Sequence, residues 1–103
     1  MFNFLKPKYK FDVVGLSHHK KNLNAVDLED PEHMYPIELI PEPTNKADKN
    51  AIKVLIDGRH IGYVPAKKCY EIHAILRKGI KDAYCYIDKD EDGYREVTAH
   101  IRY

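Results

Sequence analysis

The sequence predicts a mainly β domain of the α+β class, a small six-stranded antiparallel barrel of the SH3-like or OB-like type with one clear helix. Three observations support this prediction. Short segments that alternate apolar and polar residues recur along the chain, with turn residues between them. Only one segment, 65–78, has the spacing of an amphipathic helix. The length of 103 residues suits one core rather than two. We therefore expect 1–103 to form a single domain.

The first third of the chain begins with a strand. Residues 11–16 are rich in β-branched side chains, which favour extended structure, and the polar residues 17–21 are expected to be the end of this strand. A second, short helical turn is expected within 22–30, and it is closed by Pro31.

Three further strands are predicted in the middle of the chain. The second strand has Tyr35, Ile37 and Leu39 on one face. The third and fourth, 51–56 and 60–64, form a hairpin, because the Asp-Gly dipeptide between them suits the positive φ angles of a type I′ turn.

The last third of the chain contains the helix and the two longest strands. The helix spans 65–78, and Gly79 supplies a positive-φ stop. The strands cover 80–88 and 94–103 and form a C-terminal hairpin. The side chains expected to face the core from this hairpin are Ala83, Cys85, Ile87, Val97, Ala99 and Ile101.

Composition narrows the function classes. Apolar residues make up 44% and charged residues 32% of the chain, which indicates a globular domain, and no apolar run approaches the roughly 20 residues that span a bilayer. Residues 1–9 form an N-terminal extension without the apolar core of a signal peptide. Two cysteines without metal-ligand spacing suit a reducing compartment, so a cytoplasmic protein without cofactors or membrane partners is expected. A formal net charge of +1 is weak support for a nucleic-acid ligand.

The polar loop before the third strand is the most informative segment. Its Asn45, Asp48 and Asn50 side chains are of the type that bonds to nearby backbone N–H groups and stabilises turns. Alternatively, Asp48 accepts a hydrogen bond from a ligand hydroxyl while the ordered loop offers backbone N–H groups to a phosphate. Both interpretations hold together if a rigid loop forms a recognition site.

This pattern resembles the HIRAN domain family. The resemblance rests on Gly15-Leu16 after the first strand, on the loop element, and on Gly62-Tyr63 before the helix. The loop element comprises Asn45, Asp48, Asn50, Ala51 and Ile52. The likeness covers about 10–80, whereas 80–103 fits by position only. It implies a non-catalytic module that recognises the 3′ end of single-stranded DNA, with a helicase, a nuclease or another repair protein as a partner.

The resemblance also implies roles for individual residues. Asp48 would accept the terminal hydroxyl, while His18 and Tyr94 occupy positions of base-contacting aromatics. The chain departs from the family at Ala47, where many members have an aromatic residue, and at Ser17, where DNA-binding members have a basic one. The remaining expected binding residues are Asn45, Tyr63, Lys46, Lys49, Lys67 and Lys68.

Other interpretations stay open at this point. A protein-interaction adaptor that keeps the barrel but not DNA binding is favoured by the near-neutral charge. A metal-dependent enzyme or cation site would use the acidic hairpin tip, whose weak candidate ligands are Asp88, Asp90 and Asp92. Tyr84 and Tyr86 point away from the expected core, either packing against neighbouring strands or stacking on bases.

Overall fold

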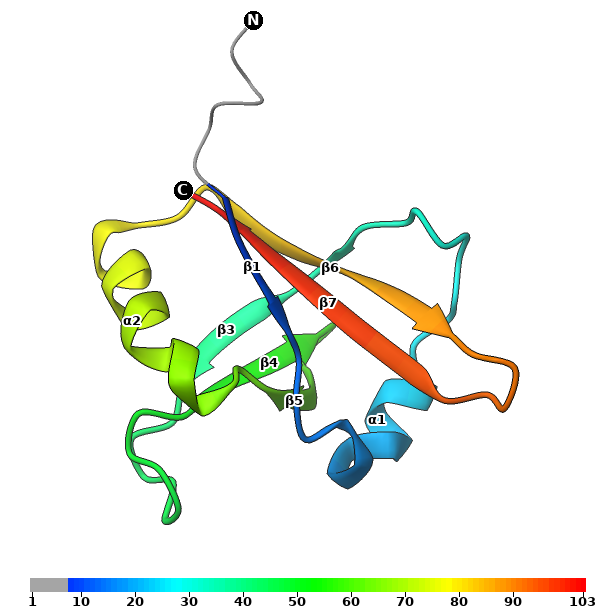
Figure 1. Ribbon diagram of the computed structural model, residues 1–103, viewed down its shortest axis with the longest axis horizontal. Coiled ribbons are helices and arrows are strands. Elements are labelled where there is room, and N and C mark those ends of the chain that lie inside the picture. Colours follow the sequence, from blue (N-terminus) through cyan, green and yellow to red (C-terminus); the bar gives the residue numbers. More distant parts are fainter. Residues whose placement is uncertain (1–7) are drawn as a thin grey trace, which may run out of the picture.

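The computed structural model describes residues 8–103 (Figure 1). Within them the strands are β1 (Lys8–Asp12), β2 (Tyr35–Pro36), β3 (Glu38–Pro41), β4 (Ile52–Ile56), β5 (Arg59–Tyr63), β6 (Asp82–Lys89) and β7 (Arg95–Arg102). The helices are α1 (Lys20–Asn24) and α2 (Cys69–Lys78), preceded by the 3-10 segments η2 (Leu16–His19) and η3 (Ala66–Lys68). The sheet thus includes Lys8 and Tyr9, which were assigned to the N-terminal extension, and residues 1–7 of that extension lie outside the described residues.

The strands form two antiparallel sheets and do not close into a barrel. One sheet has the order β1-β7-β6-β2 and the other β3-β4-β5. The chain passes between them at Ile37, whose N–H donates to a β6 carbonyl at 3.1 Å, while Glu38 already pairs with β4. On the other side, within residues 8–103, the sheets meet at one isolated bridge, between Val14 and Tyr63. The predicted six-stranded barrel is therefore not confirmed: the described residues form two sheets that do not close, and the expected second strand divides at Ile37 into β2 and β3, which raises the number of strands to seven.

The segment after β1 differs most from the prediction. The strand ends at Asp12, Gly15 adopts a φ of +73°, and η2 begins at the next residue, so 17–21 is helical rather than the end of a strand. A short helix follows, as expected, but it begins and ends earlier than the predicted range. It is anchored by Leu23, which is 3% exposed. Gly15 can redirect the chain here because glycine adopts a positive φ at little cost, whereas other residues do not.

The hairpin and the long helix match their predictions. Asp57 and Gly58 have φ angles of +50° and +75°, as a type I′ turn requires. Helical structure runs from Ala66 to Lys78, beginning as η3 and continuing as α2, and Gly79 follows with a φ of +95°. Neither helix in the described part of the chain is long and apolar enough to cross a membrane.

The core lies between the two sheets and is sealed by α2 and α1 (Figure 1). All six side chains that were expected to face inward from the C-terminal hairpin are buried. Cys69 and Cys85 are buried free thiols, and burial raises the pKa of Cys85 to about 12. Packing thus accounts for both cysteines without a metal or a disulfide.

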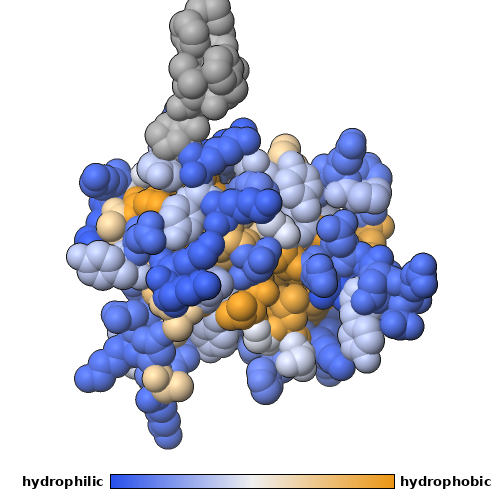
Figure 2. Space-filling model, viewed as in Figure 1, coloured by the Kyte–Doolittle hydropathy of each residue, from blue (hydrophilic) through white to orange (hydrophobic). Residues whose placement is uncertain are grey.

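The face seen in Figure 2 is mostly hydrophilic, with a small apolar region near its centre.

The outer face of the four-stranded sheet carries an aromatic cluster. Tyr84 stacks on His100 with ring centroids 5.2 Å apart, and Tyr86 meets both rings edge-on. Arg102 covers the Tyr84 ring and forms an ion pair with Asp82. These neighbours leave Tyr84 only 8% exposed, which favours the packing interpretation for this residue.

Candidate nucleic-acid interface

The polar loop after β3 is held at its base by the Glu42 carboxylate. Asn45 donates its Nδ2–H to Glu42 Oε1 at 2.7 Å, and the Tyr63 hydroxyl donates to the same oxygen at 2.8 Å. Lys53 Nζ lies 3.7 Å from the other oxygen. The two hydrogen bonds hold the pKa of Glu42 below its usual value, since they stabilise the charged form. Glu42 thereby ties the loop to the end of β5.

Two side chains that were predicted to bind ligand also order the loop backbone. Asn45 Oδ1 accepts the N–H groups of Ala47 and Asp48 at 2.9 and 3.0 Å. Asp48 Oδ1 accepts the Asn50 N–H at 2.9 Å. The local-turn interpretation therefore describes what Asn45 and Asp48 do within the fold. The second oxygen of Asp48 accepts no hydrogen bond from the described residues, so the carboxylate keeps capacity for a ligand.

Two glycines bring η2 against Tyr63. A Cβ on Gly62 would lie 2.5 Å from Val14 O and 2.6 Å from Val13 Cγ1, so only glycine allows this approach. Val14 and Tyr63 then exchange two backbone hydrogen bonds of 2.9 Å. Gly15 lies against the Tyr63 ring, because a Cβ there would be 3.8 Å from Tyr63 Cδ2. The two Gly-containing steps of the sequence pattern are thus the two sides of one contact.

Three rings gather at this contact. The ring centroids of His19 and His60 are 4.0 Å apart, and those of His60 and Tyr63 are 4.7 Å apart. Burial, with a smaller repulsion from His19, lowers the pKa of His60. His18 is exposed in η2 and makes no aromatic contact among the described residues. Both histidines lie in the 3-10 segment η2 rather than at the end of a strand.

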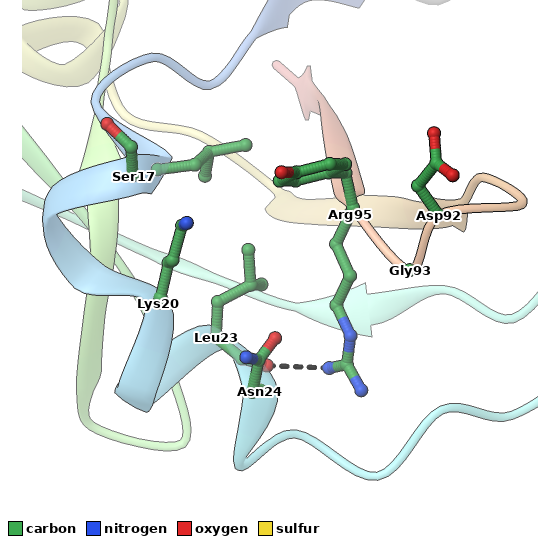
Figure 3. A pocket seen from close by; sticks show the side chains of 9 residues that line it. Ser17, Lys20, Leu23, Asn24, Asp92, Gly93 and Arg95 are labelled. Atoms are coloured by element: carbon green, nitrogen blue, oxygen red, sulfur yellow. Dashed lines mark hydrogen bonds between the residues drawn. The ribbon is translucent and has the colours of Figure 1, made fainter.

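Tyr94 lies elsewhere, next to the turn of the C-terminal hairpin. It lines a pocket of about 480 Å³ between that hairpin and the η2–α1 segment (Figure 3). Its ring centroid is 5.6 Å from Lys20 Nζ. Arg95 extends across the pocket and donates to the carbonyl oxygen of Leu23 at 2.6 Å (Figure 3). It also donates to the carbonyl oxygen of Val26 at 2.9 Å. The pocket wall is therefore held by an arginine that sequence reasoning did not single out.

The predicted phosphate-binding lysines occupy two regions. Lys46 and Lys49 are exposed on the loop, and Lys67 is exposed in η3. Lys68 points toward β1 instead, where its Nζ donates to Lys10 O at 3.3 Å and lies 5.7 Å from the Tyr9 ring centroid. The structure thus brings together the loop and Tyr63, with His19 added, but separates this group from Tyr94 and Lys68.

The acidic hairpin tip is organised by the Asp90 side chain. Asp90 Oδ1 accepts the N–H groups of Asp92 and Tyr94, both at 2.9 Å, and so stabilises the turn. Asp88 lies in β6 opposite Glu96. In the part of the chain that the structure describes, no group of three or more His, Cys, Asp or Glu side chains is placed to hold a metal ion. The weak candidate ligands Asp88, Asp90 and Asp92 are thus not gathered into such a group among the described residues, and the Asp90 carboxylate instead stabilises the turn.

Glu42, His19 and His60 were not predicted as site residues, and they differ in whether the sequence carries a local signal for them. Glu42 contacts Asn45, three residues away, and Tyr63, 21 residues away. The second contact depends on how β3 and β5 flank β4 and has no local signal. His19 and His60 likewise meet only after η2 folds against β5. The two Gly-containing steps, Gly15-Leu16 and Gly62-Tyr63, are the sequence pattern that indicates the contact between η2 and Tyr63.

Comparisons with known proteins agree with this arrangement. A model of the family described as the HIRAN domain matches residues 8–101, which includes the C-terminal hairpin. Among solved structures, the fold is similar to the crystal structure of the HIRAN domain of human HLTF, with a TM-score of 0.62 and 20% sequence identity. The alignment covers 92% of this chain and 73% of that one. None of the curated proteins compared with the chain matches it.

Proposed function

The chain belongs to the HIRAN domain family, which is associated with nucleic-acid binding, and on that premise we propose that it binds the 3′ end of single-stranded DNA without catalysing a reaction. The observation that carries the proposal is the loop after β3. Its backbone is ordered by Asn45 and Asp48, and Asn45 Nδ2 lies 3.5 Å from the Tyr63 hydroxyl. A rigid polar loop next to an aromatic face suits a ligand that combines a hydroxyl, a phosphate and a base.

Each residue has a defined role in this proposal. Asp48 accepts the terminal 3′ hydroxyl through the oxygen that is not engaged by Asn50. Tyr63 and His18 contact bases, and Tyr94 lines the path of the strand farther along. The exposed cations that meet phosphates are Lys46, Lys49 and Lys67, whereas Lys68 contributes only to the local field.

The test is a fluorescence anisotropy titration with a labelled single-stranded oligonucleotide that ends in a 3′ hydroxyl or a 3′ phosphate. The unaltered protein should prefer the hydroxyl end, because the Asp48 carboxylate accepts its hydrogen bond and repels a terminal phosphate. A hydrogen bond to a charged group contributes about 1.5–3 kcal/mol, so Asp48→Ala should weaken binding roughly 10- to 150-fold.

Two variants separate recognition from loop order. Asp48→Asn keeps an oxygen that can accept the Asn50 N–H but removes the charge, so it should narrow the preference between the two ends while the loop stays ordered. Asp27→Asn changes an exposed carboxylate outside the loop and should leave both affinities unchanged. Equal binding of both ends by the unaltered protein would contradict end recognition and leave a generic single-strand binder.

A second candidate function is a protein-interaction adaptor, and partners such as a helicase or a nuclease suit either function. The formal net charge of +1 favours the adaptor, as does the absence of an aromatic residue at Ala47. Salt dependence distinguishes the two, because phosphate contacts make affinity fall steeply with ionic strength. No DNA binding at low salt would favour the adaptor.

A further inference from the structure

The most exposed large apolar side chain among the described residues is Tyr70, at 80% exposure, in the first turn of α2. It lines a groove of about 260 Å³ together with Asn50, His73 and Arg77. The three α2 residues are spaced by three and four positions, which places them along one stripe of the helix. Neither Tyr70 nor Arg77 packs into the core.

This groove is connected to the loop that carries Asp48. His73 Nε2 lies 2.9 Å from Asn50 O, and since a carbonyl oxygen can only accept, the ring nitrogen donates. The N–H of Asn50 in turn donates to Asp48 Oδ1. Figure 1 shows the loop after β3 and the start of α2 at the same corner of the molecule. Two consecutive hydrogen bonds thus link Asp48 to the groove.

The position of Asp48 agrees with this connection. Its charge contributes, after burial, to raising the pKa of the Cys69 thiol, which is the residue before Tyr70. Asn45, in contrast, faces Glu42 and Tyr63. The loop therefore presents Asp48 toward α2 and Asn45 toward β5.

The groove offers groups that suit a nucleotide. Tyr70 presents an aromatic face that every base can stack on. Arg77 makes no ion pair among the described residues, so its guanidinium is available for a phosphate. With Nε2 donating to the loop, His73 in its neutral form keeps Nδ1 as an acceptor. The loop itself lacks an aromatic side chain, since Lys46 and Ala47 separate Asn45 from Asp48.

We propose that this groove is a nucleotide subsite for single-stranded DNA, in which the base next to the 3′-terminal one stacks on Tyr70 while Arg77 contacts a phosphate. The inference rests on the proposed function and adds to it a stacking surface supplied by α2 rather than by the loop. Stacking on Tyr70 is tolerant of sequence, so the subsite raises affinity for any strand whose end is held at Asp48.

The experiment is a double-mutant cycle by fluorescence anisotropy. The protein is unaltered or carries Tyr70→Ala, and the oligonucleotide is intact or abasic at the position next to its 3′ end. Because stacking contributes about 1–3 kcal/mol per base, each single change should weaken binding roughly 5- to 150-fold, and the second change should add little to the first. Tyr70→Phe should keep near-normal affinity. Arg77→Gln should reduce the slope of log affinity against log salt by about 1, whereas Tyr70→Ala should not change it.

The matched control is Met34→Ala, which removes another exposed apolar side chain, 47% exposed, outside the groove. Circular dichroism should be unchanged for Tyr70→Ala because the side chain is exposed. If Tyr70→Ala binds like Met34→Ala while Asp48→Ala still loses affinity, the subsite is wrong and the proposed function stands. If the unaltered protein binds no single-stranded DNA, both are overturned.

Discussion

Replacement of Gly62 by alanine tests the contact on which the candidate interface depends. The added Cβ would meet Val14 O at 2.5 Å, and that carbonyl would have to move by about 1 Å to reach an ordinary contact of 3.4 Å. Such a movement would break the two 2.9 Å backbone hydrogen bonds between Val14 and Tyr63. The change therefore separates η2 from β5 at the one point where the two sheets meet on that side.

The cost follows from these contacts. Overpacking costs about 1–3 kcal/mol, and each lost hydrogen bond costs about 0.5–1.5 kcal/mol. Since relief of the clash and loss of the bonds are partly one event, we expect a decrease of about 2–5 kcal/mol in the free energy of unfolding. For a domain of this size, each 1 kcal/mol corresponds to roughly 4–8 °C in Tm, so Tm should fall by at least about 8 °C.

Thermal unfolding followed by circular dichroism measures this change, with Gly58→Ala as the matched control. Gly58 has a φ of +75° but nothing within 4 Å of the added Cβ, so that variant bears backbone strain of only about 1–2 kcal/mol. If Gly62→Ala unfolds at the same temperature as Gly58→Ala or the unaltered protein, the close approach of Val14 is not what requires glycine. The argument that η2 is held against Tyr63 by this contact would then fail.

Three further predictions concern Glu42 at the base of the loop, the His60 ring, and Arg95 in the pocket beside α1. Hydrogen bonds from Asn45 and Tyr63 lower the pKa of Glu42, so they stabilise the fold above the ordinary carboxyl pKa of 4.5, and this stabilisation is lost as the pH falls through the lowered pKa of the folded protein. Chemical denaturation at several pH values should show that Glu42→Gln abolishes this part of the acid sensitivity. Burial lowers the pKa of His60, so the free energy of unfolding should fall as the pH drops below the ordinary histidine pKa of 6.5 and level off below the pKa of the folded protein. NMR titration of the His60 ring should give a midpoint under 6.5, and a midpoint at or above 6.5 would contradict the burial argument. Arg95→Met should remove the donor to Val26 O and one of the two donors to Leu23 O, whose other donor is the Val26 N–H, and cost about 1.5–3 kcal/mol. Hydrogen exchange should be faster, with the change confined to α1. Slower or unchanged exchange there would show that the arginine does not hold the pocket wall.

Some features of the candidate site have causes within a few residues, whereas others depend on residues far apart in the sequence. That Asn45 and Asp48 stabilise a turn follows from their own chemistry, since the N–H groups they accept are two or three residues away. That Glu42 organises the loop does not follow from local chemistry, because Glu42 needs Tyr63 from a strand on the far side of β4. The groove beside Tyr70 likewise exists only because α2 packs next to Asn50.

By itself the sequence determined the elements whose causes lie within a few residues. The Asp57-Gly58 turn, the helix that ends before Gly79, and the inward-facing residues of the C-terminal hairpin all follow from local φ preferences and side-chain periodicity. Only the tertiary structure decided that the second predicted strand divides at Ile37 between two sheets, and that Gly15 turns the chain into η2. Periodicity specifies which face of a strand is buried but not which strand becomes its neighbour, because pairing depends on contacts between residues far apart in the sequence.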